Sequence, residues 1–149
     1  MNTTKNTGAK KQSYDGFTED ERGAMKERAR ELKTASRRDA NDEGSLLAKI
    51  AEMADADRVL AERFHAIVTT NVPTLTPTTW YGMPAYARDG KVVCFFQPAQ
   101  KFKARYATIG FNEAANLDDG VMWPTAFALT ELTAAAEKKI TALVKQAAG

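Results

Sequence analysis

The distribution of apolar side chains divides this 149-residue chain at Gly44. Residues 1–44 hold 10 apolar residues, and Leu32 is their only Val, Ile or Leu, whereas residues 45–149 hold 55. A segment so poor in aliphatic side chains cannot bury enough surface to offset the entropy lost when its backbone is ordered. We therefore expect one packed domain over residues 45–149, a length that suits a single core.

Three segments are expected upstream of this domain. Residues 1–16 are rich in Asn, Thr, Lys and Gly without periodicity, which is typical of a disordered tail. A capping box that begins at Thr18 predicts a helix over residues 17–34. The apolar stripe of this helix is thin, which favours a solvent-exposed helix, with a partner-docking surface as the alternative. Residues 35–44 are expected to form a linker.

Charge and composition exclude several classes of protein. The net charge is only +2, and basic and acidic residues are balanced on both sides of Gly44, which argues against a nucleic-acid partner. No apolar run approaches the ~18 residues of a membrane span, and no secretory signal pattern is present. A single cysteine, Cys94, is ordinary for a chain in a reducing compartment. We expect a cytoplasmic protein without a membrane partner.

Helical periodicity occurs at both ends of the domain. Leu46, Leu47, Ile50 and Met53 give one short helical face, and a second helix, capped by Asp55 or Asp57, should end before Pro73. A terminal amphipathic helix of about fourteen residues is predicted with Thr133 as its N-cap.

Strand patterns occupy the middle of the domain. Thr78–Ala87 and Lys91–Gln97 are rich in aromatic and β-branched residues, and Asp89-Gly90 between them is typical of a hairpin. The run Val92–Phe96 is apolar on both faces, which predicts a strand that is covered on both sides or central in its sheet, and the most buried strand.

Two further strands and the fold class follow from the same patterns. Lys103–Phe111 alternates as a third strand, and Pro124 restricts Val121–Leu129 to a short edge strand. Because strands and helices do not alternate along the chain, we expect an α+β fold. A small antiparallel sheet should pack against N-terminal and C-terminal helices.

The sequence offers few residues for catalysis. Neither a G-x-G-x-x-G turn nor a phosphate loop is present, so no nucleotide cofactor is predicted. The one histidine, His65, lies at the rim of a helical apolar stripe and is interpreted as structural. Cys94 lies in the densest apolar run, where burial would raise its pKa and suppress its reactivity. We therefore expect a protein that is not an enzyme, with an unrecognised hydrolase or transferase as the weaker alternative.

The candidate ligand site is an aromatic surface. Rigid rings around a Gly and a Pro in Trp80–Tyr86 indicate a bulge or a close backbone approach. A pocket there would be lined by rings and a thioether, with a basic side chain at its mouth. The residues predicted for it are Trp80, Tyr81, Met83, Tyr86, Tyr106 and Trp123, with Lys103 or Arg105 at the mouth.

The string Trp80-Tyr81-Gly82-Met83-Pro84-Ala85-Tyr86, followed by Asp89-Gly90-Lys91-Val92-Val93 and Phe95-Phe96, resembles the YdhG-like family of small bacterial domains of unknown function. The resemblance extends over about residues 45–148. It implies an α+β domain with an antiparallel sheet against helices, and it supplies no catalytic residues. Some members are described as frataxin-like iron chaperones.

That description implies iron as a second kind of partner. Such a chaperone would hold iron weakly through exposed carboxylates. Candidate metal ligands here are Asp55, Asp57, Asp118 and Asp119, although Asp118 and Asp119 before Gly120 also fit a simple turn. The leading hypothesis is a binding domain for a small ligand or a protein segment on the aromatic surface. Iron handling is the alternative.

Overall fold

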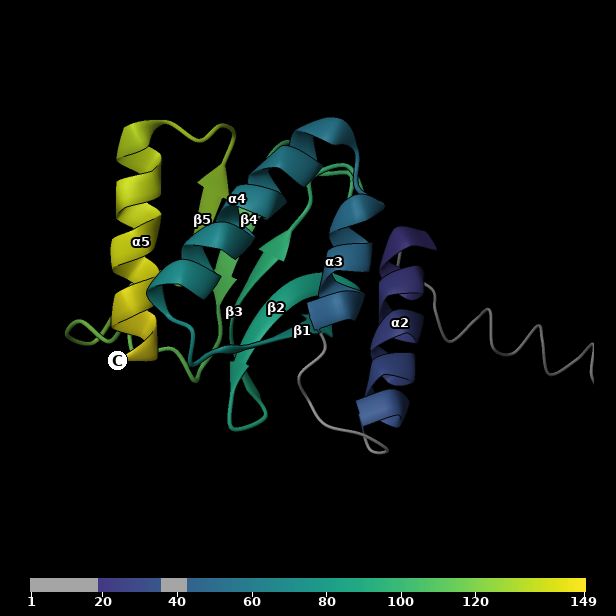
Figure 1. Ribbon diagram of the computed structural model, residues 1–149, viewed down its shortest axis with the longest axis horizontal. Coiled ribbons are helices and arrows are strands. Elements are labelled where there is room, and N and C mark those ends of the chain that lie inside the picture. Colours follow the sequence, from purple (N-terminus) through teal and green to yellow (C-terminus); the bar gives the residue numbers. More distant parts are fainter. Residues whose placement is uncertain (1–18, 36–42) are drawn as a thin grey trace, which may run out of the picture.

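The computed structural model of the protein describes residues 19–35 and 43–149 (Figure 1). The predicted tail over residues 1–16, the capping residue Thr18 and most of the predicted linker lie outside the described residues. In chain order the elements are α2 (Glu19–Ala35), α3 (Glu43–Ala51), α4 (Asp55–Asn71), β1 (Thr76–Trp80), β2 (Met83–Arg88), β3 (Lys91–Gln97), β4 (Ala107–Phe111), β5 (Ala126–Leu129) and α5 (Ala134–Ala148).

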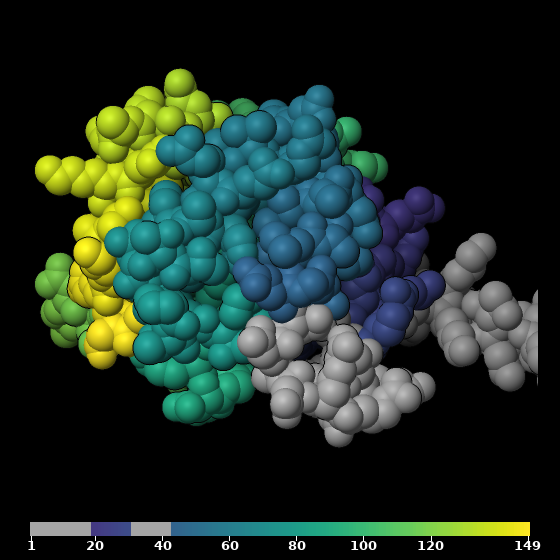
Figure 2. All heavy atoms as spheres, in the orientation of Figure 1, coloured from purple at the N-terminus to yellow at the C-terminus, as the bar shows by residue number. Residues whose placement is uncertain are grey.

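The five strands form one antiparallel sheet in the order of the chain, β1-β2-β3-β4-β5. Helices α3, α4 and α5 lie over one face of this sheet, and their atoms cover most of that face (Figures 1 and 2). The α+β prediction, with an antiparallel sheet packed against N-terminal and C-terminal helices, is therefore confirmed. Within the described ranges, no helix combines the length and apolar character that crossing a bilayer requires.

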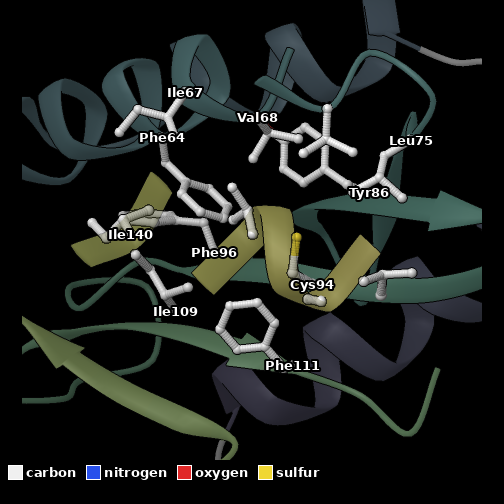
Figure 3. Packing of buried hydrophobic residues seen from close by; sticks show 14 of the residues in the cluster. Phe64, Ile67, Val68, Leu75, Tyr86, Cys94, Phe96, Ile109, Phe111 and Ile140 are labelled. Atoms are coloured by element: carbon white, nitrogen blue, oxygen red, sulfur yellow. The ribbon is translucent and has the colours of Figure 1, made fainter. Parts of the chain in front are cut away.

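The core lies between the helices and the sheet. Phe64 from α4 meets Tyr86 edge to face at a centroid distance of 5.6 Å and also contacts Phe96 at 6.4 Å. All three rings are fully buried, and Figure 3 shows them together with Ile67 and Val68 beneath α4. Ring pairs of this geometry add to the stability already gained from burying their area. The central part of α4 is therefore fixed to the middle of the sheet.

The sequence predicts one strand over Thr78–Ala87, and this prediction is wrong. The segment is split into β1 and β2 by a two-residue turn at Tyr81 and Gly82, which have φ of 54° and 75°. Positive φ at both central positions is the geometry of a type I′ hairpin turn, which follows the twist of the strands. The predicted turn at Asp89-Gly90 has the same geometry, with φ of 53° and 80°.

Strand β3 is the central strand, as predicted, but it is not the most buried one. Five of the six residues of β2 are buried, whereas β3 keeps Lys91 exposed and Phe95 half-buried. A register shift opposite Tyr86 and Ala87 lets the consecutive residues Val93 and Cys94 both enter the core. A β-bulge places one extra residue on a strand, which explains why the apolar pattern lost its alternation there.

The predicted third strand is shorter than expected. Strand β4 begins at Ala107, because the chain from Lys101 to Tyr106 turns, with a φ of 54° at Lys103. Strand β5 is the predicted short edge strand after Pro124.

The helix boundaries agree with the sequence for α4 and α5 except at one cap, whereas α3 begins at Glu43, inside the predicted linker, and ends before Met53. Helix α4 ends before Pro73, and the Thr133 side chain accepts a hydrogen bond from the Ala136 N–H at the start of α5. The N-cap of α4 is Ala54, so neither Asp55 nor Asp57 caps that helix.

Helix α2 is docked on the domain, in contrast to the solvent-exposed helix that we expected. It contacts β1 and lies beside α3, as Figures 1 and 2 show. Its Ala24 is 4% exposed, and its Glu27 pairs with lysines from two other segments. Met25 and Ala29, which belong to the predicted apolar stripe, are exposed, and the ion pairs of Glu27 join residues far apart in the sequence.

Candidate functional site

The predicted aromatic surface does not form one pocket. Tyr86 is fully buried in the core and Met83 is 5% exposed, whereas Trp80 and Tyr81 are half-buried. The Trp80 ring lies 4.9 Å from Tyr81 and 5.0 Å from Phe95, between ring centroids. Side chains alternate between the faces of a sheet, so β1 and β2 cannot present all these residues together.

The remaining predicted ligand residues lie elsewhere. The Arg105 guanidinium lies over the ring of Tyr106, 5.1 Å from its centroid, and Trp123 packs against the hydrophobic core. Of the predicted set, Lys103 alone lines the cleft described below.

Tyr86 ends a hydrogen-bonded chain that reaches the surface. Its hydroxyl lies 2.9 Å from Nδ1 of His65, whose Nε2 lies 2.8 Å from the Glu43 carboxylate. A carboxylate can only accept, so Nε2 of His65 donates to Glu43, and Nδ1 shares the second hydrogen bond with the Tyr86 hydroxyl. Burial, together with the nearby Cys94 and Glu43, raises the Tyr86 pKa well above its usual range. The chain thus satisfies a buried hydroxyl, and His65 is engaged at both nitrogens.

Cys94 is a free thiol in the core, with no exposed surface. Burial raises its pKa well above its ordinary value. Because the thiolate is the reactive form, this cysteine is unsuited to attack a substrate at neutral pH.

An open cleft of about 650 Å³ borders the Trp80–Tyr86 string at Gly82. It lies where the start of α2, the end of α3, the turn at Gly82 and the chain after β3 meet. We call it the lysine cleft. Its lining residues are Asp20, Lys49, Glu52, Met53, Ala54, Asp57, Gly82, Pro98, Gln100, Lys101 and Lys103. Its volume falls in the range of roughly 300–1,000 Å³ that is typical of small-ligand pockets.

One carboxylate lies at the centre of the charges beside this cleft. Oε1 of Glu27 accepts a hydrogen bond from Nζ of Lys101 at 2.8 Å, and Oε2 accepts one from Lys49. Burial raises the Glu27 pKa, but the hydrogen bonds from Lys101 and Lys49 outweigh it and lower the pKa below its ordinary value. Glu27 is therefore ionised at neutral pH.

Gly82 lets this ion pair approach the backbone. A Cβ built on Gly82 would collide with the Glu27 carboxylate and the Lys101 ammonium group. Nζ of Lys101 also lies 3.4 Å from the Gly82 carbonyl oxygen. The close backbone approach predicted for this string is thus present at Gly82, where the ion pair of Glu27 and Lys101 approaches the backbone.

Asp57 holds the opposite wall of the cleft. Its carboxylate accepts hydrogen bonds from the backbone N–H groups of Ala99 and Gln100, at 3.1 and 2.9 Å. Asp57 is 5% exposed, so its charge is compensated by these two dipoles. The contact ties the first turn of α4 to the chain after β3.

The four predicted metal ligands are not brought together. Asp57 is engaged with the backbone, Asp55 pairs with Arg58 at 3.0 Å, and Asp118 and Asp119 lie exposed between β4 and β5. Among the described residues, no group of three His, Cys, Asp or Glu side chains is placed to hold a metal ion. Iron binding stays a prediction from the sequence.

Sequence reasoning missed the residues that shape the lysine cleft. Glu27, Lys49 and Lys101 come from three distant segments, and each reads as an ordinary surface charge in the sequence. The only available signal was Gly82, whose close approach did not say which group approached.

Comparisons with protein-family models, with curated proteins and with solved structures give no match.

Proposed function

We propose that this chain is a binding domain that recognises a small carboxylate-bearing ligand in the lysine cleft, without chemical turnover. One observation supports this proposal above all others. Three lysines from α3 and from the chain after β3 converge on carboxylates beside an open cleft of about 650 Å³. The site borders the aromatic hairpin that the sequence singled out, but charged groups of neighbouring segments supply most of its polar lining.

The charged residues that residues 43–149 contribute to the cleft favour binding of an anion. Residues 43–149 contribute Lys49, Lys101 and Lys103, against Glu52 and an Asp57 whose oxygens already accept two N–H groups. Ammonium groups held in a partly enclosed site attract carboxylates more strongly than they do in bulk water. Met53, Ala54 and Pro98 add apolar wall, which suits a ligand with a short carbon skeleton.

The remaining reactive side chains support binding without turnover. Cys94 is buried with a raised pKa, and His65 is engaged with Tyr86 and Glu43. A buried free thiol also fits the reducing environment of the cytoplasm, which we propose as the location.

Citrate is a suitable probe of this proposal. In a titration of the ¹⁵N-labelled full chain, at ionic strength held constant with sodium chloride, we expect shifts confined to residues around the lysine cleft. Lys101→Ala combined with Lys103→Ala should weaken citrate binding by about tenfold, because two charge-assisted contacts are lost.

The control removes the same charge elsewhere. Lys91→Ala combined with Lys138→Ala alters two exposed lysines on β3 and α5, and its citrate affinity should match that of the wild type. Equal losses in the two double variants, or shifts spread over the whole surface, would show unspecific charge attraction and would contradict the proposal.

A further inference from the structure

The lysines of the cleft and the carboxylates that contact them most closely come from different parts of the chain, although Glu52 of α3 also lies 3.8 Å from Lys49. The lysines belong to residues 43–149, whereas Glu27 and Asp20, the carboxylates that contact them most closely, belong to α2. Asp20 and Glu27 are seven residues apart, so they lie on one side of a helix, with the buried Ala24 between them. Helix α2 therefore presents the domain with a pair of carboxylates.

Ion pairs form a prominent part of the docking of α2. Among residues 19–30, whose side chains the structure describes, Ala24 is the single buried apolar residue, and Met25 is 38% exposed. Arg28 adds a contact with the Tyr81 ring, 5.8 Å from its centroid. Contacts with so little buried apolar surface as those of residues 19–30 open at a low free-energy cost.

One of the two carboxylates is incompletely satisfied. Oδ2 of Asp20 is buried, yet it receives no hydrogen bond within the described chain, and its ion pair with Nζ of Lys103 measures 3.5 Å. A buried carboxylate oxygen without a hydrogen bond is unfavourable. A ligand carboxylate that is free to adjust its position would pair with Lys103 more closely.

We infer that α2 acts as an internal competitor, whose Glu27 and Asp20 occupy the lysines that a ligand with two or more carboxylates binds. This inference rests on the proposed function. A polycarboxylate reaches Lys101 and Lys49 only when Glu27 leaves them, so ligand binding and α2 docking exclude one another. Binding then releases α2 from the β1 edge of the domain. When the cleft is occupied, the chain then exposes the surfaces that α2 and the β1 edge cover in the docked state.

Hydrogen exchange on the full chain tests this coupling directly. Citrate should speed deuterium uptake in residues 19–35, while the core strands β2 and β3 keep their protection. Acetate at matched ionic strength is the control, because a single carboxylate cannot bridge two lysines. It should leave residues 19–35 protected.

A pair of variants on α2 provides the second measurement. Glu27→Gln removes the competing carboxylate and should tighten citrate binding on the order of tenfold, which is typical of coupled equilibria. Glu19→Gln makes the same change of charge on an exposed position of α2 and should leave the affinity unchanged.

The outcomes separate this inference from the proposed function. If citrate binds in the cleft while residues 19–35 stay protected, or if Glu27→Gln binds no more tightly than Glu19→Gln, the competition is refuted and the binding site remains. If citrate binds neither the wild type nor Glu27→Gln, both proposals fail. Binding to Glu27→Gln alone supports both.

Discussion

At the scale of single residues, two glycines occupy equivalent turn positions but have different surroundings. Gly82 and Gly90 both occupy the second position of a type I′ turn, with φ of 75° and 80°. A side chain at Gly82 would meet Glu27 and Lys101, whereas a Cβ at Gly90 would have no heavy atom within 4 Å. A substitution at Gly90 therefore changes only the free energy of the backbone conformation, whereas one at Gly82 also disturbs the contact with α2.

Replacing each glycine by alanine tests this distinction. Gly90→Ala should lower the free energy of unfolding by about 1–2 kcal/mol, the penalty for a left-handed non-glycine residue. Gly82→Ala should show the same backbone penalty and also displace Glu27, so residues 19–35 should lose hydrogen-exchange protection in this variant alone. Urea unfolding and hydrogen exchange measure the two effects. Loss of α2 protection in both variants would show that the contact at Gly82 does not hold the helix.

Residue types also explain why one of the two hairpin turns could be predicted from the sequence and the other could not. The turn at Asp89-Gly90 was predictable because Asp tolerates a positive φ and Gly favours it. The turn at Tyr81-Gly82 was not, because an aromatic residue at a positive φ is rare. That single unusual residue is why one predicted strand became two.

At the scale of elements, Asp57 shows how one side chain joins two segments. The sequence suggested a helix cap or a metal ligand, but its oxygens accept the N–H groups of Ala99 and Gln100 instead. This contact crosses 42 and 43 positions of sequence, so no local pattern could indicate it.

Substitution of Asp57 should therefore destabilise the link between α4 and the chain after β3. Asp57→Ala leaves two backbone donors without their acceptor and should cost about 2 kcal/mol, and Asp57→Asn, which keeps one acceptor oxygen, should cost less. Asp55→Ala is the matched control. Its carboxylate is 91% exposed, and the change should stay within about 0.5 kcal/mol. Chemical denaturation measures all three, and equal effects at positions 55 and 57 would contradict this structural role.

Among the elements, the helices themselves were predicted better than the surfaces against which they pack. The periodicity of α4 and α5 identifies the apolar stripe of each helix from the sequence alone. The site of α2 docking depends on which lysines the fold brings to it, and lysines look alike in a sequence.

At the scale of the whole molecule, two buried ionisable groups link folding to pH. Burial raises the pKa of both Cys94 and Tyr86 in the folded state. Each group keeps its proton in the folded chain and loses it in the unfolded chain, above about pH 8.5 for Cys and about pH 10 for Tyr. The unfolded state then binds fewer protons, so stability is fully present below these values and falls as the pH rises.

Cys94→Ala isolates the first of these contributions. The wild type should lose stability relative to this variant above pH 8.5, with a slope that approaches about 1.4 kcal/mol for each pH unit near pH 10. Urea unfolding of both proteins at several pH values gives this difference. Tyr86 is present in both proteins, so its contribution cancels. A difference that stays constant with pH would mean that the thiol ionises within the folded protein.

The sequence by itself determined the composition of the core, the order and type of most elements, and the α+β class. These follow from local periodicity and from turn residues, each of which is readable within about ten positions. Only the tertiary structure decided the docking of α2, the bulge that brings Val93 and Cys94 into the core, and the meeting of Glu27 with Lys49 and Lys101. The physical reason is that apolar burial acts through a repeating pattern, whereas an ion pair depends on the positions of two specific atoms. Those positions are set only when the whole chain has folded.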